Sequence, residues 1–442
     1  MSSDRQGNRL SGATTSAASD YDQALAEFNL YRGDPVATVD RALAAAPGFA
    51  MAHVLKAYLL GLAPSRRPRP RRPTLSRRRA ASPWRRGRRR ISRPSTGSWR
   101  ATGQRPPRPC IGTTSSIPTT LLGLQAGHLM DFYRAASRDL RDRIARAMPH
   151  WSGSTPGRSI VLGMYAFGLE EMGDYARAEA VGREALDGEP FDCWAHHAVA
   201  HVMEMQGRAQ DGVGWAMSRE AHWAGDDNFF KVHNWWHRAL CHLDLGQVDD
   251  VLRLYDGPIR GSRSTIALDL VDASALLWRL HLAGHDVGER WDEVARCWDQ
   301  HADARLYPFN DWHATMAYLG AGRDADVDRA IGMLERSAAG SADTAAWIRD
   351  VGLPLIRGFR AFWRGNYREC AEGLHAARVI VNRFGGSHAQ RDVVDWTLAE
   401  AALRGGMKTL AEALAHERLA LKPHSAINRA FLRRARGTAA AT

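Results

Sequence analysis

Apolar residues recur along most of this chain at intervals of three and four positions. Between them lie many Ala, Leu, Glu and Arg residues, which favour helices, whereas the alternating runs typical of strands are scarce. The N-terminal part from Tyr21 to Ala63 shows the same spacing in two or three segments, YDQALAEFNLYRG, PVATVDRALAAAPG and FAMAHVLKAYLLG. The pattern predicts an all-α protein.

A longer repeat is superimposed on the helical spacing. Gly173 is followed by Tyr175 and then by Pro190, and the next turn glycine is Gly207. The step from Gly173 to Gly207 equals the period of the tetratricopeptide repeat (TPR), a pair of antiparallel helices of about 34 residues. Further turn glycines continue the series at Gly246, Gly284, Gly322, Gly365 and Gly406, with steps of 39, 38 and 38 between Gly207 and Gly322.

Each residue type in this repeat has a physical role in a helical hairpin. The glycine suits the tight turn between two helices, where a positive φ is often needed. The proline ends the second helix before the next unit begins. One hairpin cannot bury its apolar face alone, so such units stack into a superhelix. We expect a TPR-like α-solenoid, with a non-repetitive helical bundle as the alternative.

An arginine-rich segment interrupts the helical pattern. Seventeen arginines and no acidic residue lie between Arg66 and Arg108, and ten of the 19 prolines lie between Pro64 and Pro118. Without those arginines the net charge of +12 becomes −5. Such a composition cannot bury enough apolar surface to fold, which predicts a disordered insert.

Three interpretations of this insert stay open. The first is a basic arm that binds nucleic acid non-specifically by charge. The second is an inert linker, and the third is a stretch of the gene read out of frame. We favour the third, because the helical flanks KAYLLGLA and LLGLQAGHLMDFY stop abruptly at its borders. The predicted division is therefore 1–63 for N-terminal helices of the array, 64–118 for the insert and 119–442 for the TPR-like domain.

The composition narrows the protein class further. No apolar run approaches the roughly 20 residues of a membrane-spanning helix, and residues 1–13 contain no hydrophobic signal segment. The five cysteines are scattered and without CxxC spacing, which argues against a disulfide framework. We expect a cytoplasmic protein that has no membrane partner.

Histidines gather on two of the expected helices. The helix over 191–206 carries His197, His201 and Glu204 on one face, and the helix over 232–245 carries His233 and His237 on one face, beside Trp236. Adjacent units could bring the two faces together. Three interpretations are open: a shared metal ion, a polar ligand pocket, and buried hydrogen bonding between helices. The HExxH motif of many zinc sites is absent, and we assign no metal.

Further polar residues, on other helices, could line the same interior pocket as these histidines. Taken singly, each is also compatible with an ordinary solvated helix face. The full set of candidate pocket residues is His197, His201, Glu204, His233, Trp236, His237, Asp272, Asp311, His313, Gln390, Arg391 and Asp392. No P-loop, GxGxxG, GxSxG or kinase motif is present, so the sequence names neither catalytic residues nor a cofactor.

Several short strings, in this order, resemble the tetratricopeptide repeat protein 38 family, also called StaR-like. They include HHAVAHVMEMQGRAQDGVGW, HNWWHRALCHLDLG, FNDWHATMAYLG, GGSHAQRDV and ERLALKPHS, and the resemblance covers the chain from Leu121 onwards. It implies a cytoplasmic, TPR-like protein and no particular activity. The chain departs from the family over 64–118, where the family has further helices.

Two functions are compatible with these observations. The first is an interaction scaffold that holds a protein or peptide partner in the concave groove of the superhelix. The second is an enzyme or small-molecule binder with a His/Asp-lined pocket inside the superhelix. Convergence of the histidines with Asp311, His313 or Arg391 on one closed cavity would favour the second; groups paired with each other would favour the first.

Overall fold

A computed structural model describes residues 2–62, 120–303, 307–341 and 343–437. Within these ranges the chain forms helices joined by turns, together with two isolated β-bridges, so the predicted all-α class is confirmed. The insert over 64–118 lies outside the described residues. The structure therefore does not test its three interpretations. No helix of the described part combines the length and the apolar character needed to cross a membrane.

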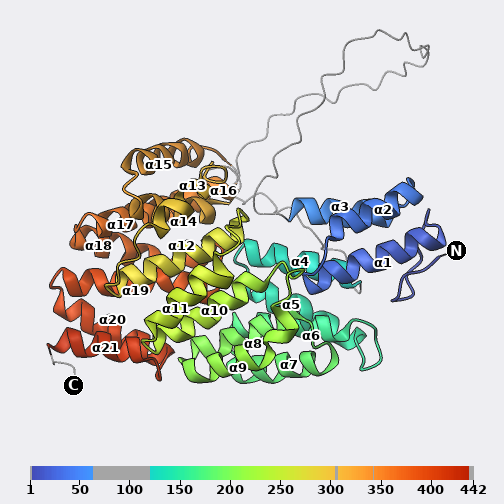
Figure 1. The fold of residues 1–442 in the computed structure, drawn as a ribbon, viewed down its shortest axis with the longest axis horizontal. Helices are drawn as coiled ribbons and strands as arrows, with labels where there is room; N and C mark the ends of the chain where they lie inside the picture. Colours follow the sequence, from blue (N-terminus) through green and yellow to red (C-terminus); the bar gives the residue numbers. More distant parts are fainter. Residues whose placement is uncertain (1, 63–119, 304–306, 342, 438–442) are drawn as a thin grey trace, which may run out of the picture. The chain divides into compact units, whose positions relative to one another are not determined.

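The described part folds into helices, most of which pack in pairs with a sequence neighbour (Figure 1). They are α1 (Thr15–Leu30), α2 (Pro35–Ala45), α3 (Ala50–Gly61), α4 (Leu121–Tyr133), α5 (Ser137–Ala147), α6 (Arg158–Glu170), α7 (Tyr175–Gly188), α8 (Cys193–Met205), α9 (Ala209–Trp223), α10 (Lys231–Asp244), α11 (Val248–Leu254), α12 (Ala267–Leu282), α13 (Arg290–Trp298), α14 (Pro308–Gly320), α15 (Asp324–Ala338), α16 (Asp343–Trp347), α17 (Leu353–Trp363), α18 (Tyr367–Ala377), α19 (His388–Arg404), α20 (Lys408–Leu421) and α21 (Ala426–Arg436). Short 3-10 turns (Met148–His150, Arg378–Phe384) and π turns (Tyr255–Ile259, Ile348–Gly352) extend four of them.

The turn glycines lie where the repeat predicts them, between the two helices of a pair. All seven of them have a positive φ, between 66° and 87°: Gly173, Gly207, Gly246, Gly284, Gly322, Gly365 and Gly406. A side chain in this left-handed region costs roughly 1–2 kcal/mol. The repeated glycine therefore reports a backbone requirement, and the antiparallel hairpins of a TPR-like solenoid follow from it.

Side-chain caps fix where several helices begin. Asp192 accepts hydrogen bonds from the amides of Trp194 and Ala195 at the start of α8. Ser387 and Gln390 form a reciprocal capping box at the start of α19. These caps set the registers of the two helices that carry most of the polar interior.

Helix α19 departs from a simple linear array. In a solenoid each unit contacts its sequence neighbours, yet α19 packs against α8 and α12 as well as against α17, α18 and α20. Each residue from His388 to Leu403 is buried or half-buried. The C-terminal units thus fold back onto the middle of the chain, and polar groups far apart in sequence meet there.

The glycine at position 207 provides a test of this packing. An added Cβ at Gly207 would lie 2.8 Å from the backbone nitrogen of Ser425, whereas at Gly246 it would meet nothing within 4 Å. Gly246→Ala should lower the free energy of unfolding by about 1 kcal/mol through its positive φ alone, and Gly207→Ala by clearly more. Urea denaturation measures both; equal losses would show that the C-terminal units do not pack at this turn.

Candidate functional site

The two predicted histidine pairs meet in the interior. The rings of His197 and His201 on α8 have centroids 4.3 Å apart, and those of His233 and His237 on α10 are 4.8 Å apart. Across the helices, His197 lies 4.8 Å from His233, and His201 lies 4.5 Å from His237. All four residues are at most 3% exposed. The four rings therefore lie together in one group, and we call these residues the four-histidine cluster.

Aromatic side chains wall the cluster from solvent. Trp236 stacks on the ring of His233 at 5.2 Å with an interplanar angle of 17°. Phe167 from α6 stacks on His197, and Phe230 meets the same ring edge-on. A low-dielectric surrounding of this kind strengthens each electrostatic contact inside it.

Three of the four imidazoles face a buried carboxylate through Nδ1. Nδ1 of His233 lies 2.8 Å from a carboxylate oxygen of Asp272 on α12, and Nδ1 of His237 lies 2.9 Å from a carboxylate oxygen of Glu204. Glu170, at the end of α6, has an oxygen 3.4 Å from Nδ1 of His201. When Nδ1–H donates to a carboxylate, the Nε2 of a neutral ring is left with a lone pair.

Those remaining nitrogens have few donors near them. Nε2 of His233 lies 3.1 Å from Nε2 of His197, so the N–H of His197 can satisfy one lone pair. Nε2 of His201 and Nε2 of His237 are buried without a hydrogen-bond partner among the described residues. The cluster therefore contains more imidazole lone pairs than protein donors.

Burial sets the charges of this region. Burial, with the nearby His201, lowers the pKa of His237 to about 3 even though Glu204 acts in the opposite direction. Burial also lowers the pKa of His197 well below its usual value, and the neighbouring imidazoles add to the effect. For Glu204, burial alone would raise the pKa, but Lys422 and His237 together lower it to about 2. The carboxylate is therefore charged, while His197 and His237 are neutral at pH 7.

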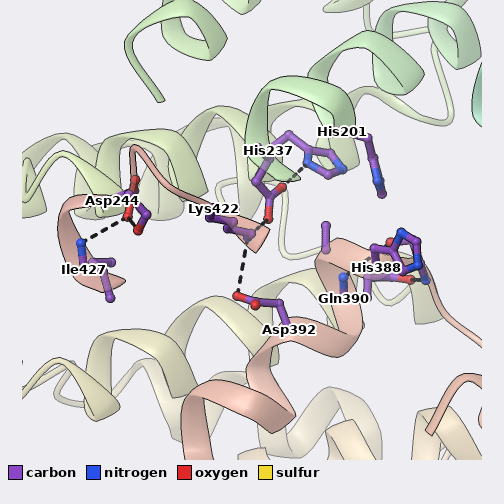
Figure 2. Close-up of polar contacts among 12 residues, drawn as sticks. His201, His237, Asp244, His388, Gln390, Asp392, Lys422 and Ile427 are labelled. Atoms are coloured by element: carbon purple, nitrogen blue, oxygen red, sulfur yellow. Dashed lines mark hydrogen bonds and ion pairs between the residues drawn. The ribbon is translucent and has the colours of Figure 1, made fainter. Parts of the chain in front are cut away.

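A chain of ion pairs links Glu204 to the C-terminal helices. Lys422 Nζ lies 3.6 Å from Glu204 and 3.6 Å from Asp392 (Figure 2). Asp392 also accepts hydrogen bonds from Arg418 at 3.0 and 3.2 Å. Burial would raise the pKa of Asp392, but Arg418 and Lys422 lower it below the usual range. Asp392 thus joins the candidate site through a lysine rather than by direct contact.

A second chain connects the cluster to the start of α19. The Glu170 carboxylate lies near both His201 and His388, each at 3.4 Å. Glu171 accepts hydrogen bonds from the backbone N–H of His388 at 2.8 Å and from Arg391 Nη2 at 3.0 Å. Arg391 is therefore near the cluster, but its charge is already compensated by Glu171.

Three further sequence candidates lie on α14 and α19. Gln390 completes the cap of α19, and His313 Nδ1 lies 2.8 Å from the carbonyl oxygen of Phe309 one turn earlier. Asp311 is buried on the same helix α14, where its backbone oxygen accepts a bond from Thr315. Gln390 and His313 therefore act within their own helices.

Several charged groups that complete the candidate site are absent from the set of pocket residues predicted from the sequence. They are Glu170, Glu171, Lys422, Arg418 and Arg279, which are all buried among the described residues. Glu170 and Glu171 end an otherwise apolar run, and Arg279 stands inside LLWRLHL. A charge within an apolar helix is the signal that would have pointed to them, because it needs a buried partner.

The free space beside the site is small. A cavity of about 40 Å³ is lined by residues that include Glu204, Arg279, Asp392 and Lys422. Such a volume has room for a few water molecules, whereas sites for organic ligands span roughly 300–1,000 Å³. The site can exchange protons or hold an ion, but this cavity does not admit an organic substrate.

Comparison with known proteins adds little to this picture. No family model matches the chain. Among solved structures, the chain is similar to one in the crystal structure of the APC/C hetero-tetramer Cut9–Hcn1, with 14% sequence identity and a TM-score of 0.38. The match covers 73% of this chain and 57% of that chain. A similarity of this size carries no inference about partners.

The interaction between the His201 and His237 rings can be measured as a coupling in the free energy of unfolding. His201→Ala and His237→Ala, made singly and together, should change the free energy of unfolding non-additively by about 0.5 kcal/mol or more, because contacting residues share one environment. The control pairs His201→Ala with His53→Ala, which lies on the exposed face of α3, and should be additive. If the effects of both pairs of substitutions were additive, the rings of His201 and His237 would not interact and the cluster would be refuted.

The cap of α8 gives a pH-dependent prediction. Burial raises the pKa of Asp192 to about 7, although the amides of Ala195 and Trp194 act against it. The folded protein then holds a proton that the unfolded chain releases near pH 4, so this residue costs stability as pH rises from about 4 to about 7. Asn caps helices as well as Asp, and Asp192→Asn should gain stability relative to the wild type over that range.

Urea unfolding at pH 4.5, 6.0 and 7.5 measures this difference. Asp34→Asn at the exposed cap of α2 controls for the exchange of a capping carboxylate. Parallel pH profiles for the wild type and Asp192→Asn would contradict the prediction.

Proposed function

We propose that the protein is an interaction scaffold of TPR-like architecture and a member of the tetratricopeptide repeat protein 38 family. The family assignment rests on the ordered strings from HHAVAHVMEMQGRAQDGVGW to ERLALKPHS. Antiparallel helix pairs present broad side-chain surfaces on a rigid frame, which is how repeat proteins bind other proteins. Within the array, the concave groove remains our predicted location for a protein or peptide partner.

The geometry of the interior favours this function over the enzyme alternative. The buried carboxylates Asp272, Glu204 and Glu171 are each engaged by a histidine or an arginine. An acid or base acting on a substrate needs space to reach it, and the adjoining cavity of about 40 Å³ holds only a few waters. Carboxylates that are already paired are compatible with a scaffold interior.

An exposed aromatic pair is the observation that carries the proposal. Phe191 is 41% exposed and Phe229 is 50% exposed. The Arg32 guanidinium lies 5.0 Å from the centre of the Phe191 ring, and the Arg32 backbone forms an isolated β-bridge with Asn228, the residue before Phe229. Phenylalanine and arginine are both enriched in protein–protein interfaces relative to the rest of the surface.

Substitution of this aromatic pair tests the scaffold function. The full chain is used as bait, and retained proteins are compared between the wild type and a Phe191→Ser/Phe229→Ser double variant. A specific partner should be recovered at least about 10-fold less by the double variant, since two interface aromatics together contribute more than about 1.4 kcal/mol.

The matched control is Val379→Ser, which removes another exposed apolar side chain, 78% exposed, after α18. It should retain the partner. Equal recovery by all three chains would overturn the assignment of this surface, and turnover of a small molecule by the purified protein would favour the enzyme alternative.

A further inference from the structure

The four-histidine cluster has the features of a metal centre rather than of ordinary buried hydrogen bonding. One ring nitrogen from each of His197, His201, His233 and His237 lies within 4.8 Å of those of the other three. Zinc bound tetrahedrally by imidazoles at 2.0–2.1 Å places its nitrogens about 3.3 Å apart. His197 Nε2 and His233 Nε2 are already 3.1 Å apart. A pair at the 4.8 Å limit would have to close by about 1.5 Å, which is less than about 1 Å for each ring when both move.

The surrounding carboxylates orient the rings as a metal site requires. In metal sites the ligating histidine donates its second ring N–H to a carboxylate, which fixes the tautomer and makes the free nitrogen more basic. Asp272 and Glu204 do this for His233 and His237 at 2.8 and 2.9 Å, and Glu170 faces His201 at 3.4 Å. Three independent helices, α6, α8 and α12, supply these carboxylates.

The unsatisfied nitrogens are the second observation. Nε2 of His201 and Nε2 of His237 are buried and have no hydrogen-bond partner among the described residues. Leaving a buried polar atom unpaired costs roughly 1–3 kcal/mol. A cation at the centre would satisfy the lone pairs of all the rings at once.

A competing group nearby is less suited to an ion. Glu170, Glu171 and His201 also come within 4.8 Å of one another. However, both oxygens of Glu171 already accept hydrogen bonds, one from the His388 amide and the other from Arg391. This leaves Glu170 as the partner of the His201 ring and leaves the four imidazoles as the ligand set.

We infer that His197, His201, His233 and His237 bind one first-row divalent transition metal ion of the kind that imidazole prefers, such as Zn²⁺. Four protein ligands complete a tetrahedron and leave no open position, which is the arrangement of structural sites. The ion joins α8 to α10, and through the carboxylates it ties α6 and α12 to the same point. It stabilises the scaffold and performs no chemistry.

Metal analysis of the full chain, purified without a histidine tag, tests this inference. We expect about one zinc or other first-row metal per chain in the wild type. Because the site is buried, removal should need denaturant together with a chelator. Refolding with Zn²⁺ should then raise the melting temperature above that of the metal-free chain. Refolding with Co²⁺ alone should give the visible absorption of a tetrahedral cobalt ion.

The variants separate ligands from neighbours. His233→Ala and His237→Ala should lose the bound metal, whereas His313→Ala, which removes a buried histidine outside the cluster, should keep it. Glu204→Gln leaves all four ligands in place and should weaken metal affinity about 10–100-fold in competition with a chelator. This variant keeps the test decisive where a histidine variant fails to fold.

Two results would overturn the inference. The first is a folded wild-type chain with no stoichiometric metal and with a melting temperature that Zn²⁺, Co²⁺ and Ni²⁺ leave unchanged on refolding. The second is full metal content in both His233→Ala and His237→Ala.

Discussion

The interior of this protein depends on the pairing of buried carboxylates with buried imidazoles. An ionised carboxylate moved away from water is strongly unfavourable unless a partner compensates it. Asp272 and Glu204 reach His233 and His237 within 2.9 Å, and Glu170 reaches His201. These contacts join four helices, so each helix position is constrained by charge as well as by apolar packing. Losing one partner would leave the other buried and unpaired.

The need to pair buried charges also accounts for the packing of α19 against α8 in the interior. Glu171 and Glu204 present negative charge from α6 and α8, and Arg391 and Lys422 bring positive charge from α19 and the end of α20. Apolar contacts alone would tolerate small shifts of one helix over another, whereas ion pairs at 3.0–3.6 Å fix the position. The C-terminal units are therefore part of the same interior as α8 and α10.

The proposed structural metal site and the proposed scaffold function occupy different parts of the molecule. The polar centre is closed by Trp236, Phe167 and Phe230, and the exposed aromatic pair Phe191 and Phe229 lies on the surface. In these proposals the first set belongs to the rigid interior and the second to the binding surface. Phe230 directly follows Phe229 in the chain, so the loop between α9 and α10 connects the interior with the proposed binding surface.

The helical class, the turn glycines and the two histidine faces can be predicted from the sequence, because they depend on local spacing and on φ. The sequence could also name Asp272 and Asp392 as candidates, though not their partners. Only the tertiary structure decided that Glu170, Glu171 and Lys422 belong to the site and that His313 and Gln390 act locally. The reason is sequence separation: contacts such as Glu171 to Arg391 join residues 220 positions apart, and no local pattern encodes which distant charges meet.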